Sequence, residues 1–321
     1  MYELLTMGRI SVDVYPNDIG VGLEDVETFG KFLGGSPSNV AVAAAKYGHK
    51  TSVITSVGND PFGVFLRREL NRYGSDDKNV IVNNDLQTCV TFCAIKPPED
   101  FPLYFYGRFP TAPDLQITKQ QVDLDAVKNA KIFWTTLTGL CQEPARGAQL
   151  AAHAARPRED LADNQHTILD LDFRPMFWAN PEDATAAAKE SLKYATIAIG
   201  NREECATAVG DGTPDEQADR LLEAGIKIAV VKMGAQGVMA KTANERIVSA
   251  PVPVETANGL GAGDSFGGAF THGILSGWAL QQVLDFANAA GAIVASQIAC
   301  SEAMPVESEV KALLEERGRG F

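Results

Sequence analysis

Basic residues are in short supply in this chain of 321 residues: 28 Lys and Arg stand against 41 Asp and Glu, and the formal net charge is −13 at pH 7. Such a surface repels nucleic-acid backbones and anionic lipid, and no basic run offsets it. Long apolar runs are missing too, because no segment approaches the roughly 18 consecutive apolar residues that cross a bilayer. We therefore expect neither a nucleic-acid-binding protein nor a membrane-spanning one.

Cysteine is also scarce, and its spacing argues against a disulfide scaffold. An odd, sparse set is typical of a reducing compartment, which predicts a cytoplasmic protein. No metal site is expected at Cys89 and Cys93, because no second Cys or His pair has ligand spacing. The N-terminal residues carry two acids and no long apolar run, so we expect no signal peptide. The five cysteines are Cys89, Cys93, Cys141, Cys205 and Cys300.

Two common nucleotide-binding patterns are missing as well. The phosphate loop GxxxxGK[ST] occurs nowhere, and the glycine-rich stretch from Gly261 has Phe266 where the dinucleotide fingerprint GxGxxG needs its last glycine. Any nucleotide must therefore bind through a different kind of loop.

What the chain does contain is a regular alternation of short β-branched runs and longer helical patterns. We expect strands over 4–12, 50–57, 130–134, 167–171, 196–199 and 226–232. We expect helices over 38–47, 61–73, 144–155, 184–192, 203–208, 215–223, 264–276, 280–296 and 308–316. This alternation predicts an α/β protein whose mainly parallel central sheet has helices on both faces.

Two stretches, 14–33 and 83–108, interrupt the alternation because neither has a helical period. The second contains the strand-like runs TCVTFCAI and LYFYGRF. We expect these stretches to form a small sheet outside the main one, acting as a lid. Because the chain has no repeat and no linker, residues 1–321 are predicted to form a single domain.

The strongest local pattern is NGLGAGDSFGGAF. Its glycines Gly259, Gly261 and Gly263 leave the backbone bare just before an apolar helix, and bare N–H groups at a helix N-terminus bind anions. Asp264 lies in the first turn of that helix. From these residues alone a plainer interpretation stays open, in which Asp264 caps the helix and the glycines only form a turn.

Two further patterns accompany it. The stretch FLGGSPSNVAVAAAKYG places Gly34 and Gly35 before a polar helix start, where small residues let a ligand approach the backbone. The stretch IAIGNREE puts Asn201 and Glu204 one turn apart at another helix start. An exposed helix start with ordinary acidic residues is the plain alternative for the second pattern.

Together the three patterns resemble the ribokinase/PfkB family of carbohydrate kinases. The GGxxxN, NxxE and GAGD blocks occur in that family's order and spacing, and the resemblance covers essentially the whole chain. It implies a ribokinase-like three-layer α/β/α fold with a small β-sheet lid, and transfer of phosphoryl from ATP, with Mg²⁺, to a sugar hydroxyl. The segments LDFRP and SEAMP are similar to one subfamily, the 5-dehydro-2-deoxygluconokinases of inositol catabolism.

The resemblance also implies roles for the matching residues. Asp264 would take the proton from the attacking sugar hydroxyl. The backbone N–H groups of Gly261, Ala262 and Gly263 would form an anion hole for the transferred phosphoryl group. The residues expected to hold sugar hydroxyls are Asp13, at the end of the first strand, and Gly35, Ser36 and Asn39.

On the nucleotide side, Asn201 and Glu204 would organise Mg²⁺ and the phosphates, Glu204 through water. A solvated strand end at Lys232 and a plain core helix at Asn288 stay open as alternatives to nucleotide contacts. The family uses the corresponding turn and helix against the nucleotide, which implicates Lys232, Gly234, Gly237 and Asn288.

A keto-deoxy sugar acid carries a carboxylate, for which this acidic chain must supply a local cation. Arg108 in the lid and Arg174 just after Asp172 are the best candidates, because a guanidinium matches a carboxylate bidentately. Arg9 is a weaker third. Asp172 is expected to reach the site at the carboxyl end of its strand. Surface salt bridges are the plain alternative for the first two arginines.

One position departs from the family pattern. Many members have Asp and Thr where this chain has Asn258 and Gly259, in the segment that helps to build a monovalent-cation site. Loss of the carboxylate puts a potassium requirement in doubt and leaves the Mg²⁺ requirement unaffected.

The resemblance thus implies an ATP-dependent kinase for the terminal (C6) hydroxyl of 5-dehydro-2-deoxy-D-gluconate. Alternatives on the same scaffold are a 2-keto-3-deoxygluconate kinase and a fructokinase, and an alternative of another class is a non-catalytic sugar-sensing protein. Sugar binding should close the lid and exclude water. Open lid strands have unpaired edges, from which we expect a homodimer through two lids.

Overall fold

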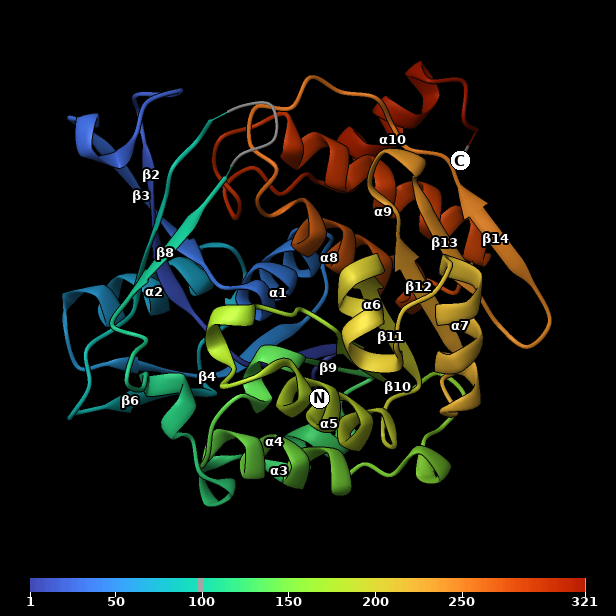
Figure 1. Cartoon of the computed structure of the whole chain (residues 1–321), viewed down its shortest axis with the longest axis horizontal. Helices are drawn as coiled ribbons and strands as arrows, with labels where there is room; N and C mark the ends of the chain where they lie inside the picture. The colour runs from blue at the N-terminus through green and yellow to red at the C-terminus, as the bar shows by residue number, and fades with distance from the viewer. Residues whose placement is uncertain (97–100, 321) are drawn as a thin grey trace.

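The protein is described by a computed structural model that covers residues 1–96 and 101–320 (Figure 1). Its main sheet has the strand order β14-β13-β12-β11-β10-β9-β1-β4-β5, and β6 also pairs with β4. All pairs from β12 to β5 are parallel, whereas β13 and β14 are antiparallel. The strands are β1 (Leu4–Met7), β4 (Thr51–Gly58), β5 (Ser75–Asp76), β6 (Val80–Asn83), β9 (Ile132–Thr136), β10 (His166–Asp170), β11 (Ile197–Asn201), β12 (Ile228–Lys232), β13 (Val238–Lys241) and β14 (Arg246–Ser249).

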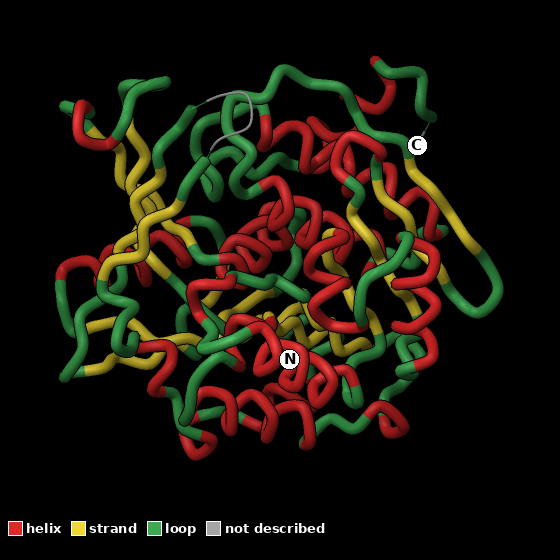
Figure 2. The backbone as a smooth tube through the Cα atoms, in the orientation of Figure 1, coloured by secondary structure: helices red, strands yellow, loops and turns green. Residues whose placement is uncertain are grey.

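Helices cover both faces of this sheet. Figure 2 shows its strands between helices above and below. α1, α8, α9 and α10 share a hydrophobic core with one face, and α3 to α7 pack on the other. None of the helices in the described part of the chain combines the length and the hydrophobicity needed to cross a membrane. Their bounds are α1 (Ser36–Lys46), α2 (Pro61–Arg72), α3 (Leu124–Asn129), α4 (Ala145–Ala154), α5 (Pro181–Leu192), α6 (Arg202–Val209), α7 (Pro214–Glu223), α8 (Ala262–Leu275), α9 (Leu280–Ala295) and α10 (Glu307–Glu316).

The central strands are apolar on both faces because both faces are covered. Along β11, Ile197 and Ile199 belong to the core with α8 and α9, whereas Ala198 belongs to the core with α5 and α6. Side chains alternate between the faces of a strand, so burial of both faces gives the unbroken apolar runs seen in the sequence. The predicted three-layer α/β/α arrangement with a mainly parallel sheet is confirmed.

The first predicted strand, over 4–12, is wrong as a single element. Gly8 has a φ of 147°, and the chain leaves the main sheet there. It continues as β2 (Ser11–Pro16), which belongs to a second sheet. Asp13 therefore does not end a strand of the main sheet; it lies inside β2.

The second sheet has four strands in the order β3-β2-β7-β8. β3 (Phe29–Gly34) and β8 (Leu103–Tyr106) are antiparallel to their neighbours, and β7 (Val90–Cys93) is parallel to β2. Figure 1 shows this sheet standing beside the main sheet. Most of it comes from 14–33 and 83–108, as predicted, although the part of the second stretch at 97–100 lies outside the described residues.

Small residues bring helices α1 and α8 close together. A side chain on Gly268 would collide with Ala43 and with the backbone of α1. This close contact aligns the starts of the two helices, so that Asn39 on α1 meets Asp264 on α8. The fold thereby joins two of the sequence patterns that are separated by more than two hundred residues.

Candidate active site

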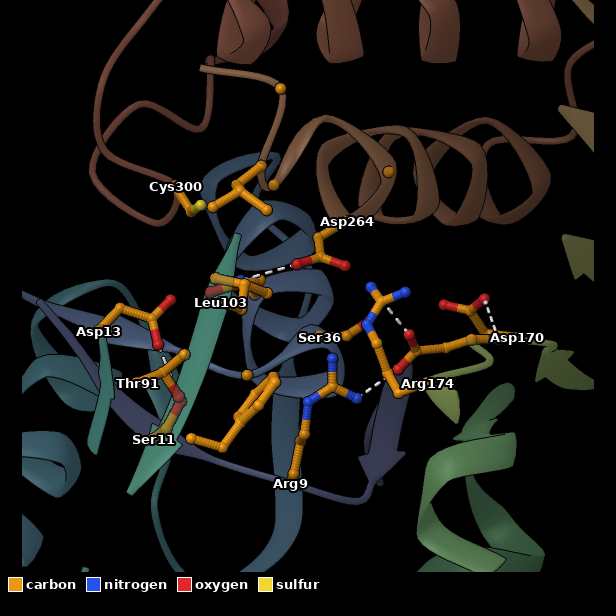
Figure 3. A pocket seen from close by; sticks show the side chains of 18 of the residues that line it. Arg9, Ser11, Asp13, Ser36, Thr91, Leu103, Asp170, Arg174, Asp264 and Cys300 are labelled. Atoms are coloured by element: carbon orange, nitrogen blue, oxygen red, sulfur yellow. Dashed lines mark hydrogen bonds and ion pairs between the residues drawn. The ribbon is translucent and has the colours of Figure 1, made fainter. Parts of the chain in front are cut away.

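The second sheet, β3-β2-β7-β8, is called the lid sheet. A cavity of about 270 Å³ lies between this lid sheet and the carboxyl ends of the central strands. Figure 3 shows Asp13 and Thr91 of the lid on one side, Asp170 and Arg174 on the other, and Asp264 above them. Ligands of open parallel sheets bind at this edge. Sequence-predicted residues that line it are Asp13, Gly35, Ser36, Asn39, Asp172, Arg174, Asn201, Glu204, Lys232, Gly261, Gly263 and Asp264.

A second cavity, of about 630 Å³, adjoins the first. The two share Lys232, Gly259 and Gly263 in their walls, so these residues stand at the junction. The second cavity is mainly apolar, with Val252 and Phe266 among its lining residues. It also collects the remaining residues predicted for the nucleotide and the anion hole, Gly234, Gly237, Ala262 and Asn288.

The carboxylate of Asp264 is held by a partner across the helix contact. Nδ2 of Asn39 donates to Oδ2 of Asp264 at 2.7 Å, and Oγ of Ser301 donates to Oδ1 of Asn39 at 2.7 Å. Burial raises the pKa of Asp264, while hydrogen bonds from Asn39 and Ser36 oppose the rise. Burial that destabilises the ionised form of a carboxylate makes that carboxylate better suited to accept a proton.

The start of α8 has the geometry of an anion site. Gly261 is in the left-handed region at φ 79°, and a side chain there would collide with Cys300. A Cβ added to Gly263 would lie 3.5 Å from Nζ of Lys232, which places a cation beside the helix N-terminus. Free N–H groups and a nearby ammonium together favour a phosphate.

Asp13 is also held in place, by two hydroxyl groups of its own strand. Ser11 donates to Oδ1 at 2.8 Å and Tyr15 donates to Oδ2 at 2.9 Å. Burial raises the pKa of Asp13 to about 6, against the opposing effect of these hydrogen bonds and of Arg9. Its carboxyl group lines the cavity from the lid side, where a sugar hydroxyl can reach it.

Gly35 allows the chain to pass between the lid and the main sheet. Its φ is 100°, and a Cβ there would lie 2.5 Å from the carbonyl oxygen of Arg9. Only glycine is free of strain in such a conformation. Directly after this turn, Ser36 and Asn39 line the cavity from α1.

Asn201 and Glu204 form a reciprocal cap at the start of α6. The N–H of Glu204 donates to Oδ1 of Asn201 at 2.9 Å, and the N–H of Asn201 donates to Oε2 of Glu204 at 2.6 Å. Glu204 is buried, so the alternative of an exposed helix start does not hold for it. Its carboxylate lies 4.0 Å from Nη1 of Arg174 and 3.8 Å from Nζ of Lys232.

Arg108, expected at the substrate, is not brought to either cavity. Its Nη1 donates to both carboxylate oxygens of Asp114 at 3.0 Å, and both side chains are buried. The guanidinium carbon lies 4.5 Å from the ring centre of Phe177. Arg108 therefore fastens the end of lid strand β8 to the body, and the expectation that it faces the sugar is corrected.

Two residues that were not among the main candidates line the cavity instead. Arg9 lies between β1 and β2, and its Nη1 donates to Asp172 and, at 2.8 Å, to Oγ1 of Thr138. Asp170 lies at the end of β10, and burial raises its pKa to about 7 despite the nearby Lys232. Asp170 could have been predicted from the sequence, because residues two apart on a strand share a face and Asp172 was already a candidate. No local pattern marks Arg9, because its partners are distant in sequence.

Comparison with known proteins agrees with this geometry. The family model described as pfkB family carbohydrate kinase matches residues 1–307. The chain belongs to the pfkB family of carbohydrate kinases.

Two curated relatives match almost the full length of this pfkB kinase. It is 31% identical to the 5-dehydro-2-deoxygluconokinase of Clostridium tetani, over 98% of this chain and 93% of that protein. It is 31% identical to the 5-dehydro-2-deoxygluconokinase of Geobacillus kaustophilus, over 99% of this chain and 95% of that protein.

Solved structures show the same fold as this pfkB kinase. A PfkB protein from Polaromonas sp. JS666 has a TM-score of 0.85 and 23% identity, over 97% of this chain and all (100%) of that one. A fructokinase with bound ATP from Xylella fastidiosa has a TM-score of 0.84 and 22% identity, over 99% and 100% of the two chains.

The carboxylates of this pfkB kinase fit a magnesium ion held largely by water and phosphate. Within residues 1–96 and 101–320 no group of three or more His, Cys, Asp and Glu side chains is placed to hold a metal ion. Glu204 and Asp170 nevertheless line the cavity beside Lys232. Mg²⁺ in phosphoryl-transfer sites is bound through one or two carboxylates, several waters and the substrate phosphates.

Asn258, the position at which the sequence departs from the family pattern, carries a neutral amide that is paired within the protein. This side chain is fully buried, and its Nδ2 donates to the carbonyl oxygen of Ile298 at 2.7 Å. Its Oδ1 accepts from the N–H of Leu260 at 3.0 Å. The neutral amide of Asn258 thus pairs both of its polar atoms within the protein.

Proposed function

We propose that this kinase transfers the terminal phosphoryl group of ATP to the C6 hydroxyl of 5-dehydro-2-deoxy-D-gluconate. The observation that carries the proposal is one cavity in which Asp264 stands at the N-terminus of α8 and the guanidinium of Arg174 stands opposite. The first suits an attacking hydroxyl and a phosphate, and the second suits the carboxylate of an acidic sugar. The names of the curated relatives support the choice of sugar.

In the proposed reaction Asp264 accepts the proton of the attacking hydroxyl. Asn39 holds the carboxylate at 2.7 Å, which fixes the direction from which the hydroxyl approaches. The N–H groups of residues 261–263 and the ammonium of Lys232 stabilise the negative charge of the phosphoryl group as it moves. Bound magnesium would neutralise phosphate charge, with Glu204 and Asn201 as the residues that hold it through water.

ATP is proposed to occupy the second, larger cavity. Its apolar walls, including Val252 and Phe266, suit a purine ring, and Asn288 adds a polar group. The phosphates would then pass the junction at Gly263 and Lys232, which both cavities share. This arrangement points the terminal phosphate toward Asp264.

A second candidate, 2-keto-3-deoxygluconate, has the same carboxylate and is favoured by the same arginine. A fructokinase activity is less well supported, because a neutral sugar would bring no carboxylate to the guanidinium of Arg174, which lines the cavity beside Asp172 and Glu204. The proposed order of preference is therefore the two sugar acids before any neutral sugar.

A coupled ADP-release assay with Mg-ATP tests the substrate. The panel contains 5-dehydro-2-deoxygluconate, 2-keto-3-deoxygluconate, fructose, ribose and a nucleoside. We expect a kcat/KM above about 10⁴ M⁻¹s⁻¹ for the first, with the others at least about a hundredfold lower. Strong turnover of another member would reject this sugar, and sugar binding without turnover would favour a sensor.

We also propose that two copies pair through their lids in the cytoplasm. The lid face turned away from the cavity carries Phe29, Phe92, Tyr104 and Tyr106, of which all but Phe92 are exposed. Phe92 makes edge-to-face contacts with Phe29 and with Tyr106, at 5.6 and 5.4 Å between ring centres. A row of exposed aromatic rings on a short sheet suits a second copy of the same face. The five free cysteines support a reducing compartment.

A further inference from the structure

Three charged side chains, those of Arg9, Asp172 and Arg174, contact one another in a row along one wall of the first cavity. Nη1 of Arg9 donates to Oδ2 of Asp172, and Nη2 of Arg174 lies 3.1 Å from Oδ1 of the same carboxylate. Thr138 adds a hydrogen bond to Oδ2 of Asp172 at 3.1 Å. One carboxylate thus lies between two guanidinium groups, and Arg174 also lies 4.0 Å from Glu204.

Both carboxylate oxygens of Asp172 are paired with these arginines. Although burial alone would raise it, the pKa of Asp172 is held well below its usual range by Arg174 and Arg9. Asp172 therefore stays ionised at all physiological pH values and serves to orient the two guanidinium groups. A planar guanidinium fixed by a carboxylate loses little freedom when it binds a second anion.

Arg9 retains donors that the protein itself does not use. Its Nη1 is hydrogen-bonded to Thr138 and Asp172, and within the described residues no hydrogen bond is found from Nε or Nη2 to a protein atom. Figure 3 shows the guanidinium of Arg9 rising from this wall, with one amino group directed toward Ser36. The side chain is largely buried, at 10% exposure, and yet lines the cavity.

The backbone of Arg9 is as constrained as its side chain. Its carbonyl oxygen accepts a hydrogen bond from Oγ of Ser38 at 3.3 Å and lies against Gly35. Arg9 therefore cannot swing out of the cavity without disturbing the start of α1. A donor group held this firmly is preorganised for a ligand.

The other cations of the cavity do not compete for this role. Among the described residues that line it, the cationic ones are Arg9, Arg174 and Lys232. Lys232 lies beside Gly263 and Glu204, at the end assigned to phosphate. An anionic group at the sugar end must therefore be recognised by the two arginines.

We propose that Arg9 is a specificity-determining residue that binds the carboxylate of the sugar acid through its free Nε–H and Nη2–H groups, with Arg174 as the second donor. This inference rests on the proposed function, because it requires an acidic substrate. Arg9 takes the role for which the sequence favoured Arg108. Asp172 acts as the positioning residue of the pair.

Arg9→Gln is the first test, with Arg68→Gln, an exposed arginine on α2, as the matched control. Loss of a charge-assisted bidentate contact should raise the KM for the sugar acid by about tenfold or more. The KM for ATP should change by less than about twofold, because the lost contact touches only the sugar. Arg9→Lys keeps the charge without the planar fork and should give an intermediate KM.

A double variant separates substrate binding from simple charge balance. Arg9→Gln combined with Asp172→Asn removes both charges of the buried pair together, and Arg174 keeps Glu204 as an anionic neighbour. If Arg9 binds the carboxylate, the double variant keeps the high KM for the sugar acid. Recovery of the wild-type KM would show that Arg9 only neutralises Asp172, and would overturn the inference.

The outcomes also separate this inference from the proposed function. A wild-type enzyme that phosphorylates only neutral sugars would reject the proposed substrate. An acid-selective wild type whose Arg9→Gln variant keeps its KM for the acid would reject the role of Arg9 alone. Isothermal calorimetry with the sugar acid, without ATP, gives the same comparison independently of turnover.

Discussion

Asn39 and Asp264, which are 225 positions apart, form a 2.7 Å hydrogen bond where α1 meets α8. The bond joins the GGxxxN pattern to the GAGD pattern in one site. It also holds Oδ2 of Asp264, whose carboxylate lines the cavity that a substrate hydroxyl would enter. The carboxylate is therefore oriented before the sugar arrives.

Asp264→Asn should abolish most of the turnover while sugar binding persists. The amide is almost the same size as the carboxylate but cannot accept the proton, so kcat should fall by about 10² to 10⁴. Single-turnover assays and calorimetry with the sugar measure the two effects separately. Asp125→Asn, an exposed carboxylate on α3, is the control. Retention of even a tenth of the wild-type kcat (about 10%) would contradict a proton-accepting role.

The pH dependence of the reaction should report the raised pKa of Asp264. Burial raises this pKa and the hydrogen bond from Asn39 opposes the rise. Because Asp264 must be ionised to accept a proton, kcat/KM should fall as the pH drops through its pKa. Asn39→Ala removes an opposing contact and should move this acid limb to higher pH. An acid limb that stays in place, or moves to lower pH, would disagree, and Asn71→Ala on α2 serves as the control.

Arg108→Ala should lower stability and leave sugar affinity nearly unchanged. The variant leaves the buried carboxylate of Asp114 without its cation, at a cost of about 3–5 kcal/mol of unfolding free energy. Denaturant unfolding measures this cost, and the sugar KM should stay within about twofold of wild type. Arg174→Ala is the contrast, since it should raise the sugar KM. A large rise in KM for Arg108→Ala without loss of stability would return Arg108 to the substrate site.

Potassium should have little effect on the wild-type enzyme, and Asn258→Asp should create a dependence on it. Replacing potassium chloride by choline chloride should change wild-type kcat/KM by less than about twofold. In Asn258→Asp a buried carboxylate would face the carbonyl of Ile298 without a cation, which is unfavourable. Added potassium should then raise the melting temperature of the variant and not of the wild type. Strong potassium activation of the wild type would contradict the expectation that Asn258 has removed the cation requirement.

Light scattering should find a dimer at micromolar protein concentration, and Tyr106→Glu should shift it toward monomer. Tyr106 is 61% exposed at the end of lid strand β8, so the charge should not disturb the fold of the protomer. It would be buried against a second lid, where an unpaired carboxylate is costly. Val248→Glu, on exposed strand β14, is the control. A monomeric wild type would end the lid-pairing proposal.

The parts of the site that sequence reasoning found are those whose chemistry is local. Asp264 follows its glycines by one to five positions, and Asn201 precedes Glu204 by three, so each pattern can be recognised within a single turn or helix start. The cap between Asn201 and Glu204 has the geometry that this spacing predicts. Turn and capping preferences depend on near neighbours, and near neighbours are visible in a sequence.

The arginines show where sequence reasoning stops. Arg108, Arg174 and Arg9 are equal as donors, and nothing in their flanking residues distinguishes a buried salt bridge from a ligand contact. Arg108 is taken up by Asp114 and by the ring of Phe177, which the fold brings from another element. Arg9 reaches Asp172, 163 positions away, only because the chain leaves the main sheet at Gly8.

By itself the sequence determined the family, the α/β order of the elements and the glycine-rich start of α8, because these follow from hydrophobic periodicity and from short patterns of glycine and acid. Only the tertiary structure decided that Asp13 lies in the second sheet, that Arg9 lines the first cavity and Arg108 does not, and that both polar atoms of the Asn258 amide are paired. Those outcomes depend on which distant strands and helices become neighbours, and burial then makes each charged group pair with whatever partner that packing supplies.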